Sequence, residues 1–308
     1  MNTQLTSEEL KNEVSKYSSW YHKINLGEGV ITPGYDFDEL WDMIRETRKY
    51  IDYKGKNVLD IGSWDGMWAF EAEKLGAENI IATDCHWNIE TYEKFLFVRR
   101  VLGSRVIPYF NISPYNLWDR LDVYLQENTQ TQKPYRRLFD VVQNLGLLYH
   151  VRDPLLTLSQ SRSVLQTGGY LLIETAAVVD ENASFMVFNG VPPEKSDPVG
   201  RIYNDRTTWW APTIPNLKEM LKATLFEPIE ETIHILGNER NESLAKKIKD
   251  KFKRYFPIDK GFHISRVCLV ARAINADNIS DEYFNELSRT YRNPGLVVEH
   301  LQKNKEKI

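Results

Sequence analysis

The strongest chemical signal in the sequence is a glycine-bearing turn at residues 60–66, which continues directly from an apolar run. Gly62 and Gly66 allow the chain to turn tightly and the backbone to approach a ligand, which a side chain at either position would hinder. In open α/β sheets, a turn of this kind at the carboxyl end of a strand is where nucleotide-like cofactors bind. The spacing therefore predicts a cofactor loop that contains Asp60, Gly62, Ser63, Trp64 and Gly66.

Two nucleotide-like cofactors could use such a turn. A dinucleotide site favours G-x-G-x-x-G, so that the following helix N-terminus can hold a pyrophosphate. Here the residue two positions after Gly62 is Trp64, whose indole would crowd a diphosphate, whereas S-adenosylmethionine has no phosphate to place. Asp60, shortly before the first glycine, is suited to organise the loop and attract the amino group of the cofactor. The turn therefore favours S-adenosylmethionine.

Three further polar residues stand at or beyond the ends of expected strands and are assigned to the same cofactor site. Asp84 lies 24 residues after Asp60, where a carboxylate can accept both ribose hydroxyls, although a strand-end aspartate is also a common cap or turn residue. Asn111 could reach the adenine amino group, or it could simply form a turn before Pro114. Asn144 follows the expected fourth strand and completes the set.

The candidate catalytic residues follow the fourth expected strand or stand at the end of the fifth. Methyl transfer from a sulfonium is an in-line displacement that needs positioning but no metal, and it needs a base only if the acceptor arrives protonated. His150 is the candidate base because its side chain titrates near neutral pH, and a packing histidine is the alternative. Tyr149 could orient the acceptor or belong to the core. Glu174 could bind an amine or hydroxyl, or cap a loop.

The candidate acceptor-binding residues are aromatic or charged and lie outside the expected sheet. Two of them precede the cofactor loop and could either cover the donor or form a packed anchor. The others could hold an acidic or planar acceptor, although aromatic residues in a lid also serve to exclude water. These candidates are Tyr21, His22, Arg152, Arg201, Tyr203 and Trp210.

The elements that must position these residues form an alternating pattern of short apolar runs and longer amphipathic segments. This pattern predicts an α/β fold: a Rossmann-like, seven-stranded, mostly parallel sheet with helices on both faces. Asp153 followed by Pro154 predicts the start of a helix. The expected strands are 57–61, 79–83, 106–110, 138–143, 170–174, 228–236 and 264–272.

The chain divides into three expected regions. Residues 1–50 form an N-terminal helical segment that covers the site, and residues 51–275 form the cofactor-binding domain. A lid insertion at about 176–212, rich in Pro, Gly, Asn and aromatic residues, and a charged helix at about 239–254 interrupt this domain. Residues 276–308 form a helical tail.

Composition narrows the possible partners. The 308 residues contain 39 basic and 43 acidic side chains, giving a formal net charge of −4, so nucleic-acid binding would need a local basic patch. The two cysteines, Cys85 and Cys268, lack a C-x-x-C spacing, so neither a structural metal nor a disulfide framework is expected. The polar first residues and the absence of long apolar runs predict a cytoplasmic protein without membrane contact.

At these residues the sequence resembles the class I S-adenosylmethionine-dependent methyltransferases over roughly residues 50–275. Residues 139–142, 146–154 and 172–175 look like those of the tRNA wobble-uridine carboxymethyltransferases, which make 5-carboxymethoxyuridine, and of their shorter relatives. The segments 20–24, 29–34 and 210–213 also resemble this group. The resemblance implies the fold and the methyl donor but leaves the acceptor open.

One departure from the tRNA enzymes bears on the acceptor. Those enzymes carry a longer helical region before the first motif, with basic residues for RNA and for carboxy-S-adenosylmethionine, whereas about fifty residues with many acids stand there in this sequence. We therefore expect plain S-adenosylmethionine and a small-molecule or peptide acceptor. The alternatives are a tRNA wobble-uridine methyl- or carboxymethyltransferase and a protein that binds the donor without catalysis.

Overall fold

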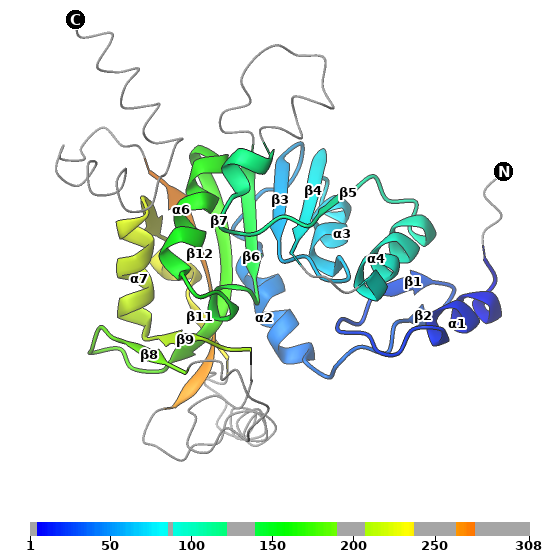
Figure 1. Cartoon of the computed structure of the whole chain (residues 1–308), viewed down its shortest axis with the longest axis horizontal. Helices are drawn as coiled ribbons and strands as arrows, with labels where there is room; N and C mark the ends of the chain where they lie inside the picture. Colours follow the sequence, from blue (N-terminus) through cyan, green and yellow to red (C-terminus); the bar gives the residue numbers. More distant parts are fainter. Residues whose placement is uncertain (1–4, 86–88, 122–138, 190–206, 237–262, 275–308) are drawn as a thin grey trace, which may run out of the picture.

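An eight-stranded sheet is the central feature of the computed structural model, which describes residues 5–85, 89–121, 139–189, 207–236 and 263–274 (Figure 1). The strand order is β10-β12-β7-β6-β3-β4-β5, and β11 pairs with β12. The pairs among β3 to β7 are parallel, and every pair that includes β12 is antiparallel. The strands are β3 (Asn57–Ile61), β4 (Asn79–Asp84), β5 (Ile107–Phe110), β6 (Phe139–Leu145), β7 (Leu165–Val178), β10 (Phe226–Pro228), β11 (His234–Ile235) and β12 (Ile264–Ala273).

The expected Rossmann-like α/β fold is confirmed, with one change near the end of the sheet. The expected strand 228–236 is instead the last residue of β10, a 3-10 turn η2 (Glu230–Thr232) and the short strand β11, which raises the number of strands to eight. The Thr232 hydroxyl accepts the backbone N–H of Val270 at 2.9 Å, where an unbroken strand would offer a carbonyl. A side-chain hydroxyl thus takes the place of a backbone acceptor at the break.

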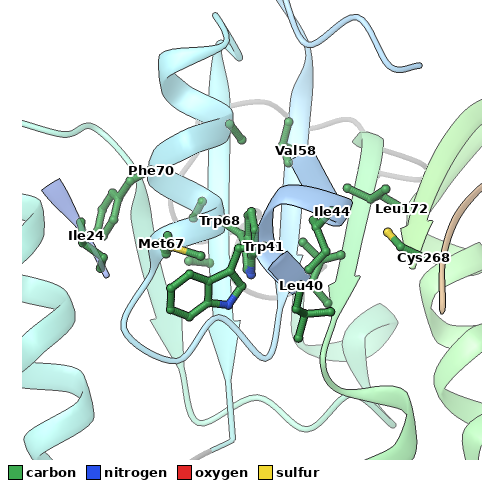
Figure 2. Close-up of a cluster of buried hydrophobic side chains, with 14 of the residues drawn as sticks. Ile24, Leu40, Trp41, Ile44, Val58, Met67, Trp68, Phe70, Leu172 and Cys268 are labelled. Carbon is green, nitrogen blue, oxygen red and sulfur yellow. The ribbon is translucent and has the colours of Figure 1, made fainter. Parts of the chain in front are cut away.

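Helices cover both faces of the sheet, and successive strand residues point to opposite faces. Val58, Val141 and Leu172 pack on one face, and their neighbours Leu59, Val142 and Leu171 pack on the other. The first face is covered by α2 (Asp38–Arg48), α3 (Met67–Lys74) and α4 (Ile89–Val101), and the second by α6 (Pro154–Val164) and α7 (Ile214–Ala223). Helix α1 (Ser7–Ser15) lies beside the short strand β2 (Val30–Ile31) and adds its buried residues to the first cluster. Figure 2 shows Trp41 of α2 and Trp68 of α3 within the first cluster, which also includes Val58 and Leu172.

Helix starts follow the residues that cap them. The Asp153 carboxylate accepts the N–H of Leu156 at 2.9 Å, and Pro154 occupies the first turn of α6, as the sequence predicts. Thr213 caps α7 in the same way, by accepting the N–H of Asn216 at 3.3 Å. These caps fix where each helix leaves the edge of the sheet.

The N-terminal segment contains α1, α2 and a short antiparallel pair, β1 (Asn25–Gly27) and β2 (Val30–Ile31), so it is only partly helical. In the expected lid region, β7 continues to Val178, and β8 (Met186–Phe188) pairs with β9 (Trp210–Pro212). The expected helix 239–254, the tail 276–308, and Arg201 and Tyr203 lie outside the described residues. None of the helices in the described ranges has the length and apolar character needed to cross a membrane.

Candidate functional site

The cofactor loop expected from the sequence connects β3 to α3 and turns through two glycines with positive φ, Gly62 at 71° and Gly66 at 91°. The backbone N–H groups of Gly62 and Ser63 donate to the Thr83 carbonyl at 2.9 and 3.0 Å, which ties the loop to β4. A Cβ on Gly66 would lie 2.5 to 2.6 Å from the rings of Phe70 and Phe95. Position 66 therefore requires glycine because the aromatic side chains of α3 and α4 pack directly against it, inside the protein.

Trp64 occupies the left-handed region at φ 50°, which is uncommon for a residue with a side chain. Its backbone N–H donates to Asp84 Oδ2 at 2.8 Å, so the aspartate at the end of β4 helps to hold this conformation. Asn111 also has a positive φ, of 68°, and is exposed just after β5. The structure thus joins Asp84 to the loop and places Asn111 at the carboxyl end of a neighbouring parallel strand.

Buried polar atoms without partners gather at the carboxyl ends of β3 and β6. Asn144 is the register partner of Ile61, which brings its side chain beside the start of the loop. Within the described residues, Asp60 Oδ2, Ser63 Oγ and both polar atoms of the Asn144 side chain are buried and lack a hydrogen-bond partner. An unsatisfied buried polar group costs about 1 to 3 kcal/mol, so such a group calls for a partner. These three residues therefore suit a polar ligand that both donates and accepts hydrogen bonds.

Asp60 is buried, and its other oxygen, Oδ1, accepts a hydrogen bond from Gln143 Nε2 at 3.1 Å. Burial raises the pKa of Asp60 to about 6, and the neighbouring Ser63 hydroxyl and the Gln143 hydrogen bond act against this rise. Sequence reasoning missed Gln143, because a glutamine in an apolar strand gains this role only from its cross-strand partner, which is Asp60.

The N-terminal segment is attached to the cofactor loop through Asp65, a fully buried residue that sequence reasoning left without a role. Asp65 Oδ2 accepts the backbone N–H of His22 at 3.0 Å, and Asp65 Oδ1 contacts His22 Nδ1. The Tyr21 ring lies 6.0 Å from the Trp64 ring, measured between centroids. Tyr21 and His22 thus lie against the loop, and His22 is buried there as an anchor.

Glu174 and Tyr149 meet at Arg266, a β12 residue that sequence reasoning did not identify. Arg266 Nε and Nη2 donate to the two Glu174 carboxylate oxygens at 2.6 and 2.7 Å, and Arg266 Nη1 donates to the Tyr149 hydroxyl at 2.9 Å. All three residues are buried. The available signal was an arginine directly before the apolar run 267–271.

His150 and the aromatic residues after it form a second group beside the 3-10 turn η1 (Leu148–His150) that follows β6. His150 Nδ1 lies 2.9 Å from the Thr207 hydroxyl, and the Trp209 N–H donates to the Tyr149 carbonyl at 2.7 Å. The Arg152 guanidinium lies 4.8 Å from the centre of the Trp209 ring, and Trp210 Nε1 donates to the Arg152 carbonyl at 2.9 Å. The structure therefore brings His150, Arg152 and Trp210 together.

Comparison with known proteins places this site in a family. Residues 36–231, well over half of the chain, match the family model described as a methyltransferase domain. The chain belongs to this methyltransferase family. The matched region contains every candidate cofactor residue from Asp60 to Asn144, so the family expected from the cofactor loop is confirmed.

Curated relatives of this methyltransferase include tRNA U34 carboxymethyltransferases. The one from Ectopseudomonas mendocina is 26% identical over 180 residues, which cover 58% of this chain and 48% of the relative. The one from Campylobacter hominis is 28% identical over 195 residues, which cover 63% and 58% respectively. The chain spans about half the length of the curated relatives it matches.

Solved structures confirm the fold of this methyltransferase. The N-terminal domain of EvdMO1, crystallised in the presence of S-adenosylhomocysteine and D-fucose, has a TM-score of 0.55 and 17% sequence identity, and the match covers 89% of this chain and 100% of that domain. A second structure of that domain, with S-adenosylhomocysteine bound, has a TM-score of 0.56 and 18% identity.

Proposed function

We propose that this chain is an S-adenosylmethionine-dependent methyltransferase that acts on a small-molecule or peptide acceptor. The observation that carries the proposal lies beside the glycine turn of a methyltransferase-family chain, where buried polar atoms of Asp60, Ser63 and Asn144 have no hydrogen-bond partner among the residues that the structure describes. S-adenosylmethionine supplies a methyl group that a sulfonium activates for displacement. The bound S-adenosylhomocysteine of the EvdMO1 domain supports this donor.

In the proposed site, this chain's side chains hold the donor by its polar ends. Asp60 binds the amino group, and Asp84 accepts the ribose hydroxyls while it keeps the Trp64 N–H bound. Ser63 and Asn144 use their buried polar atoms on the same ligand. Asn111 is assigned to the adenine amino group because it follows β5 at the same edge of the sheet.

The acceptor is placed beside His150, against Arg152, Trp209 and Trp210. Phe188, 60% exposed, adds a ring 4.8 Å from that of Trp210, so the surface offers flat apolar contacts next to a cation. Such a surface suits a planar acceptor that carries an acidic group. His150 takes the proton from the attacking group when the acceptor arrives protonated.

A tRNA acceptor is the second candidate, and the curated relatives named tRNA U34 carboxymethyltransferases favour it. The formal net charge of −4 does not. Binding to tRNA would show a steep dependence on salt concentration, because phosphate contacts release counterions. A gel-shift assay with tRNA at low salt separates the two acceptors, and the absence of binding excludes tRNA.

Mass spectrometry of the purified protein tests the donor, since a retained molecule identifies itself by mass and separates plain from carboxylated S-adenosylmethionine. Extracts incubated with donor that carries a labelled methyl group then reveal the acceptor. Labelled product with formation of S-adenosylhomocysteine supports the proposal. Tight donor binding without product in any extract supports a third candidate, a donor-binding protein without catalysis.

A further inference from the structure

A chain of buried hydrogen bonds connects the cofactor loop to Tyr53, which lies shortly before β3. The Tyr53 hydroxyl bonds to Gln143 Oε1 at 2.9 Å, and Gln143 Nε2 bonds to Asp60 Oδ1 at 3.1 Å. At most 2% of any of these three residues is exposed to solvent. Water therefore cannot replace either bond, and the orientation of one member constrains the next.

The direction of these hydrogen bonds is fixed by the chemistry of the two ends. Burial raises the pKa of Tyr53 well above its usual value, so its hydroxyl keeps its proton and can donate. When Gln143 Oε1 accepts the hydrogen bond from Tyr53, Nε2 is turned toward Asp60 and donates to the carboxylate. The opposite amide orientation would place Gln143 Oε1 against an Asp60 oxygen, which is repulsive unless Asp60 is protonated.

Asp60 needs this help because it is buried before any ligand arrives. Burial raises its pKa to about 6, and the nearby Asp84 charge acts in the same direction. The Ser63 hydroxyl, the Gln143 hydrogen bond and the electrostatic effect of His22 oppose that rise. Gln143 donates a hydrogen bond to Asp60 and is itself held in place by a second buried donor, the Tyr53 hydroxyl.

We propose that Gln143 and Tyr53 are positioning residues, which keep Asp60 ionised and direct its second oxygen toward the amino group of the methyl donor. This inference rests on the proposed role of Asp60 in donor binding. It assigns a function to a strand residue and to a tyrosine that lie outside the expected site. We call the hydrogen-bonded chain of Tyr53, Gln143 and Asp60 the relay. The relay then sets the pH at which donor affinity begins to fall.

Calorimetry with S-adenosylhomocysteine between about pH 5 and pH 8 tests the relay, with 5′-methylthioadenosine, which lacks the amino acid portion, as the control ligand. Affinity of the unchanged protein for S-adenosylhomocysteine should fall as the pH drops below about 6. In Gln143→Leu the midpoint of that fall should move up by about half to one pH unit, because a hydrogen bond to the charged form is lost. Tyr53→Phe should produce a smaller shift in the same direction.

Gln160→Leu is the matched control. Gln160 is also a buried glutamine with a hydrogen bond, in this case from the Trp118 N–H at 3.0 Å, but it lies on α6. Its replacement should lower stability without moving the midpoint. A uniform loss of affinity in Gln143→Leu and Tyr53→Phe, with the midpoint unmoved, would overturn the relay.

Asp60→Asn separates failure of the relay from failure of the proposed site. If this variant still shows the pH dependence of the unchanged protein, Asp60 is not the titrating group, and its donor-binding role fails together with the relay. If it removes the pH dependence but Gln143→Leu leaves the midpoint in place, only the relay fails. Affinity for 5′-methylthioadenosine should not follow pH in any of these proteins.

Discussion

Asp65 and His22 hold two regions of the chain together, because a single buried carboxylate accepts the backbone N–H of His22 at 3.0 Å and also contacts its ring nitrogen. Asp65 belongs to the cofactor loop, and His22 lies 43 residues earlier in the N-terminal segment. Any change that releases this contact should disturb both regions. The N-terminal segment is therefore a structural partner of the loop.

Asp65→Ala should lower the free energy of unfolding by about 1 to 3 kcal/mol, because a buried backbone donor and a histidine lose their acceptor. Urea denaturation measures the loss, and limited proteolysis should show earlier cleavage in the N-terminal segment. Asp42→Ala is the control, because Asp42 pairs with Arg45 but its carboxylate is 69% exposed. This variant should change the free energy of unfolding by less than about 1 kcal/mol. Equal stability of the two variants would contradict the anchoring role.

Asp84→Ala should weaken donor binding by about 1 to 3 kcal/mol, because the ribose hydroxyls and the Trp64 N–H lose the same acceptor. Calorimetry with S-adenosylhomocysteine provides the measurement. Asp84→Asn keeps one oxygen for the Trp64 N–H and should lose less affinity. If alanine leaves the affinity unchanged, Asp84 does not belong to the donor site.

His150→Ala should leave donor affinity intact and slow turnover by about 10² to 10⁴-fold if the acceptor is deprotonated in the reaction. Turnover is followed as labelled product with the acceptor found by extract screening. Thr207→Val, which removes the hydroxyl 2.9 Å from His150 Nδ1, should have a smaller effect in the same direction. An unaltered rate in His150→Ala would make this residue a packing histidine.

Arg266→Met should lower the free energy of unfolding by about 3 to 5 kcal/mol, because it leaves the buried Glu174 carboxylate unpaired. The double variant Arg266→Met, Glu174→Leu should recover most of this loss, since no buried charge remains. Urea denaturation of both proteins measures the difference. A double variant as unstable as the single one would show that the pair matters for packing instead of charge.

Asp60→Asn should stabilise the ligand-free protein at neutral pH while it weakens donor binding. The folded state raises the pKa of Asp60 from 3.8 to about 6, so the contribution of Asp60 to stability is full below about pH 4 and is lost as the pH rises through 6. Above pH 6 the penalty is on the order of 3 kcal/mol. Denaturation should give the asparagine variant a higher free energy of unfolding than the unchanged protein at about pH 7.5. This difference should shrink toward pH 4. A constant difference would contradict a buried, titrating Asp60.

The parts of the molecule that depend on local sequence could be predicted, and the parts that depend on register could not. Strand β3, the glycine turn and the Asp153 cap follow from neighbouring residues, and the structure contains all three. The ion pair of Glu174 with Arg266 joins residues 92 positions apart and exists only because β12 lies antiparallel to β7. Gln143 likewise gains its partner across the β3–β6 pair.

The break between β10 and β11 was missed for a related reason. Residues 228–236 have strand-forming composition, but the Thr232 hydroxyl competes with the backbone for the Val270 N–H. Such competition depends on the partner strand, which a local pattern does not contain. The roles assigned to Tyr21, Arg152 and Trp210 stay predictions. The structure places Tyr21 against the cofactor loop, and it places Arg152 and Trp210 beside His150.

The β8–β9 pair is held by main-chain hydrogen bonds, both between its two strands and to the turn after β6. The Trp209 N–H binds the Tyr149 carbonyl, the Asn189 N–H binds the Trp209 carbonyl, and the Thr213 N–H binds the Phe185 carbonyl. Peptide groups are the same whatever side chain they carry, so a mutation that replaces the exposed Phe188 ring leaves these main-chain bonds in place. A lineage with this arrangement can diversify in the molecules it modifies while it inherits the donor machinery unchanged.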